Sequence, residues 1–92
     1  MLRFVWDRDK AATNLRKHNV SFDEAATAFG DAHSLSIPDP EHSTGEERWL
    51  LVGQSLAGRL LVVAHTDRGD EIRIITARTA TRRERQIYEE DQ

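Results

Sequence analysis

Six charged residues in three short stretches of this sequence could together perform chemistry on RNA. They are Lys17, His18, Glu47, Arg48, Arg73 and Arg78. Cleavage of RNA without a metal needs a base for the ribose 2′-OH proton, cations for charge that builds on phosphorus, and an acid for the leaving oxygen. Lysine, histidine, glutamate and arginine can supply all three functions. The sequence therefore contains candidates for a metal-independent ribonuclease site.

Lys17 and His18 also have a purely structural interpretation. Ser21 and Glu24 form an S-x-x-E pattern, which predicts a capping box at the start of a helix. The preceding helix should then end near Asn19, which tolerates the left-handed conformation of helix C-termini. Positive charge in a last helical turn is favoured by the helix dipole. The pair is either a C-terminal charge of this kind or a phosphate contact beside the next helix.

Other candidates carry similar alternatives. Trp49 could stack on an RNA base or pack on an exposed sheet face, and Arg82 is a candidate RNA contact. The neighbours Glu47 and Arg48 could form only a surface ion pair, which would contribute little to stability. His65 is expected to fill the core with a hydrogen bond to the backbone.

The distribution of charge favours an anionic partner more than the net charge does. The chain of 92 residues has a net charge of −3. Residues 31–47 contain five acidic residues and no basic one, whereas residues 48–88 contain eight arginines, four acidic residues and no lysine. The planar guanidinium of arginine suits phosphate and carboxylate recognition. A charged surface on an ordinary domain is the alternative.

Several classes of protein are disfavoured. There is no cysteine, and the four histidines lack the short spacings of a metal pair. We find no phosphate-binding glycine loop and no nucleophile elbow. No apolar leader and no run of membrane-spanning length is visible. We expect a soluble, cytoplasmic protein with one domain over residues 1–92 and no cofactor.

The hydrophobic pattern predicts an α+β fold. Apolar residues at helical spacing predict helices over residues 8–18 and 22–29, and a second capping box, Thr81 with Glu84, opens a helix that ends near residue 90. Strands are expected at 2–6, 35–37, 48–56, 59–66 and 71–77, and an acidic loop at 41–47. We expect an antiparallel sheet of about four strands, with the first two helices on one face.

Short turns fix the expected pairing of the last three strands. With two-residue turns at Ala57-Gly58 and Arg68-Gly69, one face is expected to form the core beneath the helices. Its members are Leu50, Val52, Leu61, Val63, His65, Ile72 and Ile74. The opposite, mixed face then holds Glu47, Trp49, Leu51, Val62, Ala64, Thr66, Glu71, Arg73 and Ile75. Arg73 and Arg78 have opposite parity, so they share a site only if the strand ends or twists near Ala77.

Four motifs in order along the chain resemble the BrnT family. They are Phe4-Val5-Trp6-Asp7, then Asn14 with Lys17-His18 and Val20-Ser21-Phe22-Asp23-Glu24-Ala25, then Asp39, His42 and Glu47-Arg48, and finally Arg73-Ile74-Ile75-Thr76-Ala77-Arg78 with Ala80, Glu84 and Tyr88. Two positions depart from the family pattern. Thr76 stands where many members have serine, and His65 where many have tyrosine, so no catalytic role is carried over to His65.

The resemblance implies a toxin of a type II toxin–antitoxin pair with a RelE-like fold. Such a toxin is a small ribonuclease that arrests translation and growth. The implied partner is a BrnA-type antitoxin, which neutralises the toxin, binds operator DNA and represses the shared operon together with it. The alternative is a non-catalytic module that binds a DNA-binding protein as a co-repressor, with the acidic segment and the last helix as docking surfaces.

Overall fold

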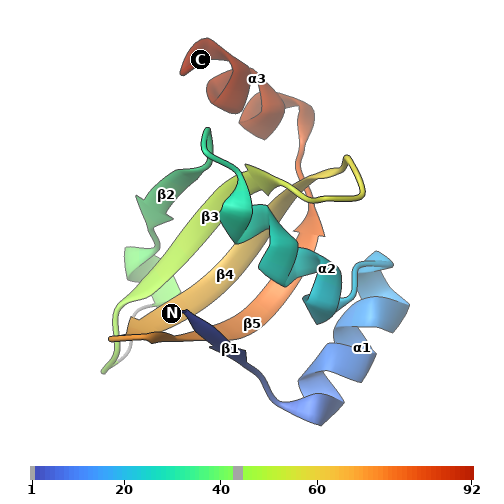
Figure 1. Ribbon diagram of the computed structural model, residues 1–92, viewed down its shortest axis with the longest axis vertical. Coiled ribbons are helices and arrows are strands. Elements are labelled where there is room, and N and C mark those ends of the chain that lie inside the picture. Colours follow the sequence, from blue (N-terminus) through green and yellow to red (C-terminus); the bar gives the residue numbers. More distant parts are fainter. Residues whose placement is uncertain (1, 43–44) are drawn as a thin grey trace.

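The computed structural model describes residues 2–42 and 45–92, which form a mixed sheet with helices on both sides (Figure 1). The elements are β1 (Arg3–Val5), α1 (Arg8–His18), α2 (Phe22–Thr27), η1 (Ala28–Gly30), β2 (Leu35–Pro38), η2 (Pro40–His42), β3 (Arg48–Gln54), β4 (Leu60–Arg68), β5 (Glu71–Thr79) and α3 (Arg82–Glu90). The expected α+β class is confirmed. Residues 43 and 44 of the expected acidic loop lie outside the described residues.

The sheet differs from the expected one in size and in one pairing. In the described part of the chain it has five strands in the order β1-β5-β4-β3-β2, rather than about four. β1 pairs in parallel with β5, while the other neighbours are antiparallel. A parallel pair needs a long connection, and here helices, β2, β3 and β4 all lie between β1 and β5 in sequence. Patterns in neighbouring segments of the sequence therefore cannot predict the pairing of β1 with β5.

Both ends of α1 follow the sequence. Asp7 caps its start by accepting a hydrogen bond from the Lys10 amide at 3.0 Å. Asn19 ends it in the left-handed conformation, with φ at 55°. The buried side chain of Asn14, inside α1, bonds the backbone of β5. Its amide nitrogen donates to the Ala77 carbonyl at 2.8 Å, and its oxygen accepts from the Ala77 amide at 3.1 Å. These are the two hydrogen bonds that a neighbouring strand would otherwise make. Asn14 therefore fixes α1 against β5.

The start of α2 forms only half of the expected capping box. The Ser21 hydroxyl accepts from the Glu24 amide at 3.0 Å. The Glu24 carboxylate is instead bound by the Arg59 guanidinium, with Nε at 2.9 Å, and by the Ser55 hydroxyl at 2.7 Å. A charge-assisted hydrogen bond from arginine is stronger than one from a neutral amide, so the carboxylate turns toward Arg59.

The β3–β4 turn places a different set of side chains on each face than expected. The loop has three residues, Leu56, Ala57 and Gly58, because Ser55 pairs with Arg59 through its amide at 2.8 Å. Gly58 has φ at 88°, the left-handed position that three-residue hairpins require. The pairing of β3 with β4 is therefore shifted by one residue from the expected pairing. Such a shift turns every side chain of β3 to the opposite face of the sheet. The expected placements of Leu50, Val52, Trp49 and Leu51 were therefore wrong.

The β4–β5 hairpin contains a second irregularity. Arg68 pairs with Glu71, so the turn is Gly69-Asp70 and not Arg68-Gly69. Farther along, His65 pairs with Ile74 and Ala64 with Thr76, which leaves Ile75 as the extra residue of a β-bulge. Beyond the bulge, each side chain of β5 therefore points to the face opposite to the one that strict alternation along the strand predicts. Arg73 and Arg78 consequently point to the same face of the sheet.

Helices cover the two faces of the sheet unequally. The face beneath α1, α2 and η1 carries the main cluster of buried residues: Val20, Phe22, Ala25, Ala28, Leu51, Leu61, Val63, Ile74 and Ala77. His65 is buried at its edge, with its ring 4.9 Å from that of Phe29. Its Nδ1 contacts an Asp67 oxygen at 2.7 Å, so the expected backbone partner was wrong.

The other face of the sheet is only partly covered. At one end, Val52, Leu60 and Val62 form a small cluster against Ala80 and Tyr88 of the α3 region. α3 has no buried residue, and Figure 1 shows it standing at one end of the sheet. The opposite end of this face is therefore left open. Within the described residues, no helix has the length and apolar character needed to cross a membrane.

Candidate active site

The open end of the sheet brings two of the predicted arginines together. Arg48 of β3 pairs with Thr66 of β4, and Thr66 pairs with Arg73 of β5. Paired residues point to the same face, and strands lie about 4.8 Å apart, so the two arginines flank Thr66 roughly 10 Å from each other. A hollow of about 170 Å³ lies over this row. We call it the cationic hollow; its lining residues are Lys10, His42, Glu46, Arg48, Thr66, Arg68, Arg73 and Ile75.

Positive charge dominates the cationic hollow. Four cations line it against a single carboxylate, that of Glu46. Arg68 binds this carboxylate, with Nε at 2.5 Å from one oxygen and Nη2 at 3.1 Å from the other, and holds the pKa of Glu46 below its ordinary value. The Arg73 side chain is exposed and forms no hydrogen bond or ion pair within residues 2–42 and 45–92. Its guanidinium is therefore available to an anion.

The floor of the hollow contains an unsatisfied hydroxyl. Thr66 is only 5% exposed, and its Oγ1 makes no hydrogen bond of ordinary geometry within the described residues, although it lies close enough to the Glu46 carboxylate to help lower the pKa of Glu46. Leaving a buried polar group without a partner costs about 1–3 kcal/mol, so such groups usually have a functional explanation. The hydroxyl lies between the two arginines at the base of the hollow.

Lys17 and His18 lie in an adjoining hollow of about 330 Å³. This second hollow runs between α1 and β5, and it shares Lys10 and Ile75 with the cationic hollow. The two hollows are therefore neighbours. Lys17 and His18 therefore face β5. They do not face the start of α2, where a phosphate contact is one of the two interpretations of the sequence.

The structure separates Arg78 from the other predicted cations. Its guanidinium makes two hydrogen bonds of 2.8 Å to the two carboxylate oxygens of Glu84. The Glu84 carboxylate also accepts from the Thr81 amide at 2.8 Å, completing the predicted capping box of α3. Arg78 lies about five residues, or roughly 15 Å, along β5 from Arg73. Its contacts attach α3 to the sheet.

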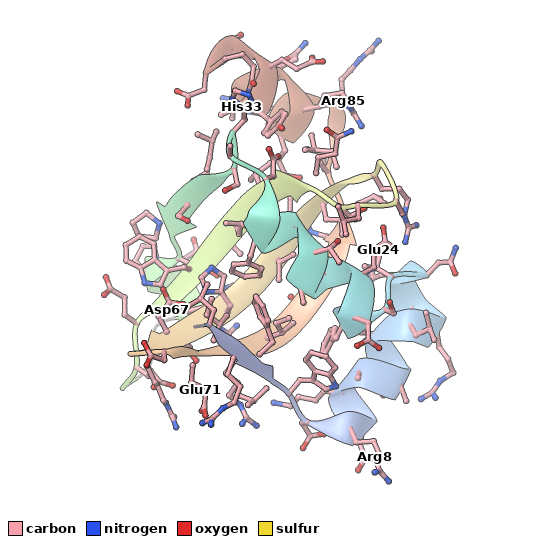
Figure 2. All side chains as sticks on the ribbon, in the orientation of Figure 1. Arg8, Glu24, His33, Asp67, Glu71 and Arg85 are labelled. Carbon is pink, nitrogen blue, oxygen red and sulfur yellow. The ribbon has the colours of Figure 1, made fainter. Side chains whose placement is uncertain are left out.

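The remaining predicted residues lie outside the cationic hollow. Trp49 pairs with His65 and so points to the opposite face of the sheet from Arg48. Glu47 is exposed and precedes β3, and the carboxylate that lines the hollow is that of its neighbour Glu46. Arg82 is an exposed residue at the start of α3. Figure 2 shows the two ends of the molecule: Asp67 and Glu71 mark the hairpin end beside the hollow, and His33 and Arg85 the α3 end.

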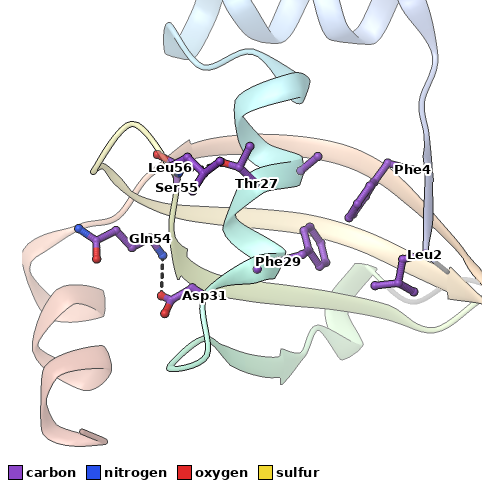
Figure 3. Close-up of a pocket in the computed structure, with 10 residues that line it drawn as sticks. Leu2, Phe4, Thr27, Phe29, Asp31, Gln54, Ser55 and Leu56 are labelled. Atoms are coloured by element: carbon purple, nitrogen blue, oxygen red, sulfur yellow. Dashed lines mark hydrogen bonds between the residues drawn. The ribbon is translucent and has the colours of Figure 1, made fainter.

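A larger hollow of about 550 Å³ lies on the helical side and has a different character (Figure 3). Its lining is mainly apolar and includes Leu2, Phe4 and Phe29. The single carboxylate there, that of Asp31, already accepts from the Gln54 amide at 2.8 Å and from the Tyr88 hydroxyl at 2.6 Å. This hollow lacks the groups needed for acid–base chemistry. Among residues 2–42 and 45–92, no group of three or more His, Asp or Glu is arranged to hold a metal ion.

Comparison with known proteins agrees with the motifs. Residues 6–84 match the family model described as the ribonuclease toxin BrnT of the type II toxin–antitoxin system. The chain belongs to the BrnT family. The crystal structure of the Brucella abortus ribonuclease toxin BrnT superposes with a TM-score of 0.69 at 19% sequence identity, covering 89% of this chain and 100% of the other. The BrnT-like fold is thereby shown. No curated protein sequence matches the chain.

Sequence reasoning missed the five other polar residues of the cationic hollow of this BrnT-family chain. They are Lys10, His42, Glu46, Thr66 and Arg68. Thr66 and Arg68 become visible once the correct register is known, because they share a strand face. His42 appeared among the family motifs, but nothing in its spacing indicated a neighbour of Arg73. Type II membership implies an antitoxin partner for the chain.

Proposed function

We propose that this chain is a toxin that cleaves RNA, with the scissile phosphate bound in the cationic hollow. The row Arg48–Thr66–Arg73 carries the proposal. It offers two guanidinium groups and one unpaired hydroxyl on rigid strands, facing a surface without a covering helix. Family membership supports ribonuclease activity as the reaction.

The arrangement suits stabilisation of charge in the transition state. Attack of the ribose 2′ oxygen on phosphorus places extra negative charge on the non-bridging oxygens, and fixed donors aimed at that charge lower the barrier. Arg48 and Arg73 would bind these oxygens, and the Thr66 hydroxyl would donate from below. Side chains alone supply these interactions, so we propose a metal-independent reaction.

The second hollow extends the proposed binding surface along the RNA. Lys17 and His18 border the same groove as Lys10, so they would contact the phosphate next to the scissile one. A cation at each successive phosphate is the usual basis of affinity for single strands. We therefore assign Lys17 and His18 the role of positioning the RNA. Proton transfer by His18 is the alternative, and the His18→Ala variant described in the next subsection tests it.

The four other predicted site residues lie at the periphery of this proposal. Arg78 and Arg82 lie toward α3, and Trp49 lies on the opposite sheet face, so an RNA would reach them only by continuing past the hollow. Glu47 is the neighbour in sequence of Glu46, which lines the hollow. Their predicted roles in catalysis or RNA binding stay predictions.

We further propose that a BrnA-type antitoxin neutralises this chain in the cytoplasm and represses the shared operon together with it. Membership of a type II toxin family supports the existence of an antitoxin. An antitoxin that covers the cationic hollow would need acidic groups to meet Lys10, Arg48 and Arg73, since complementary charge guides such contacts.

The test is cleavage of RNA by purified variants, run on free RNA and on the same message in a translation extract. We expect Arg73→Ala and Arg48→Ala each to lower cleavage by about 10²–10³-fold, the usual effect of losing one preorganised donor to the transition state. Arg85→Ala, an arginine at the far end of the molecule, is the matched control and should cleave normally. Absence of cleavage by the parent chain in both assays, with no growth arrest on expression, refutes the proposal and leaves the co-repressor alternative.

A further inference from the structure

A histidine–aspartate pair lies at the edge of the cationic hollow. His42 Nδ1 lies 3.0 Å and 3.2 Å from the two carboxylate oxygens of Asp39. The Asp39 side chain is 15% exposed and the His42 side chain is 60% exposed. A carboxylate on one ring nitrogen fixes the orientation of an imidazole and leaves the other nitrogen to exchange a proton with a ligand.

The pair is fixed to the same strand that supplies Arg48. The Asp39 amide donates to the Arg48 carbonyl at 2.9 Å, and the His42 amide donates to the Asp39 carbonyl at 3.3 Å in the single turn of η2. Pro38, the residue before Asp39, pairs with Trp49 at the end of β2. The imidazole is thereby held over the row Arg48–Thr66–Arg73, and it lines the hollow with all three residues.

Other groups in the hollow are poorer bases. Lys10 and the arginines are cations, and the Glu46 carboxylate is occupied by Arg68, which lowers the pKa of Glu46. A carboxylate with a lowered pKa accepts a proton less readily. His18 borders only the adjoining hollow, and no carboxylate binds its ring within the described residues. The geometry singles out His42.

We propose that His42, oriented by Asp39, is the proton-transfer residue of the cationic hollow. This inference rests on the proposed ribonuclease function. His42 Nε2 takes the proton of the ribose 2′-OH as the 2′ oxygen forms its bond to phosphorus and the bond from phosphorus to the 5′ oxygen breaks. The leaving 5′ oxygen takes a proton from water, and the imidazolium returns its proton to the hydroxide that remains. The products are a 2′,3′-cyclic phosphate and a 5′-hydroxyl end.

The test compares His42→Ala with two matched histidine variants. His33→Ala changes an exposed histidine at the α3 end (Figure 2), and His18→Ala removes the competing imidazole of the second hollow. Cleavage of RNA and affinity for an uncleavable 2′-O-methyl RNA are measured for each variant. We expect His42→Ala to lower cleavage about 10²–10⁴-fold, the usual contribution of general acid–base catalysis, with affinity unchanged within about threefold. His33→Ala should cleave like the parent chain.

Added imidazole separates a chemical role from a structural one. Free imidazole should restore part of the cleavage by His42→Ala in proportion to its concentration and leave Arg73→Ala inactive, because it replaces a proton acceptor and not a phosphate contact. Asp39→Asn should lower the rate with little change in RNA affinity. If His42→Ala cleaves within threefold of the parent chain, or if His18→Ala is the variant that imidazole restores, the inference fails. Loss of cleavage in Arg73→Ala would still support the proposed function in that case.

Discussion

Replacing Glu84 with glutamine should loosen α3 from the sheet. The Glu84 carboxylate accepts two hydrogen bonds from Arg78 and one from the Thr81 amide, all at 2.8 Å. The Arg78 guanidinium is the main reason that the pKa of Glu84 falls to about 2 from 4.5. No side chain of α3 is buried. This ion pair is therefore one of the few attachments that α3 has.

The expected size follows from the pKa shift. A fall from 4.5 to about 2 corresponds to about 3 kcal/mol at full strength. The Arg78 side chain is 39% exposed, so solvent screens the pair and we expect about 1–2 kcal/mol. Since the folded state favours the ionised carboxyl, this contribution is complete above about pH 4.5 and is lost as the pH falls toward 2.

Hydrogen exchange of the α3 amides measures the effect directly. In the parent chain their protection should decrease between pH 4.5 and pH 2, after correction for intrinsic exchange rates. Glu84→Gln should be less protected throughout and should lack this pH dependence. Glu90→Gln, which changes an exposed glutamate of the same helix, should behave like the parent chain.

The same series decides the role of Arg78. Arg78→Ala should lower α3 protection as Glu84→Gln does, while RNA cleavage stays within a few-fold of the parent chain. If Arg78→Ala abolishes cleavage and α3 stays protected, Arg78 is a catalytic residue, as its position in the sequence predicted, and our interpretation of the ion pair is refuted.

Three further predictions concern other contacts. Asn14→Ala should destabilise the chain by about 2–4 kcal/mol in urea unfolding, because the buried amide and carbonyl of Ala77 lose their partner; an unchanged midpoint would contradict this. The single tyrosine, Tyr88, should ionise at about pH 12 in an ultraviolet titration, since its hydroxyl donates a hydrogen bond to the Asp31 carboxylate, and at a lower pH in Asp31→Asn; equal midpoints would contradict the contact. Thr66→Val should weaken binding of uncleavable RNA about 10–150-fold while Thr66→Ser retains it, as one hydrogen bond to a charged ligand is worth about 1.5–3 kcal/mol.

Local signals in the sequence predicted the helices well. The capping residues Asp7, Asn19 and Thr81 begin or end helices as expected, because each acts through its own side chain or backbone within a few residues. The second expected helix also formed, although its last turn is the 3₁₀ helix η1. The strand segments were found, with ends that differ by at most two residues.

Features that depend on distant contacts could not be predicted. The pairing of β1 with β5 joins segments more than 60 residues apart in the sequence, and the bulge at Ile75 belongs to the pairing of β5 with β4. One extra residue in the β3–β4 turn reversed the faces of β3. The shifted register placed Arg48 and Arg73 on opposite faces of the expected sheet, whereas both residues flank Thr66 on one face of the observed sheet. Thr66 and His42 were missed because only the folded sheet brings them to the same hollow.

The proposed function requires that a phosphate of RNA bind between Arg48 and Arg73. Its most direct test follows the arginine Nε–H resonances of the chain by nuclear magnetic resonance during titration with an uncleavable 2′-O-methyl dinucleotide. We predict saturable shifts for Arg48 and Arg73, smaller shifts of both in Thr66→Val at a ligand concentration near the parent Kd, and no shift for Arg85. Shifts confined to Arg82 and Arg85, or none at Arg48 and Arg73 at saturation, would contradict the account.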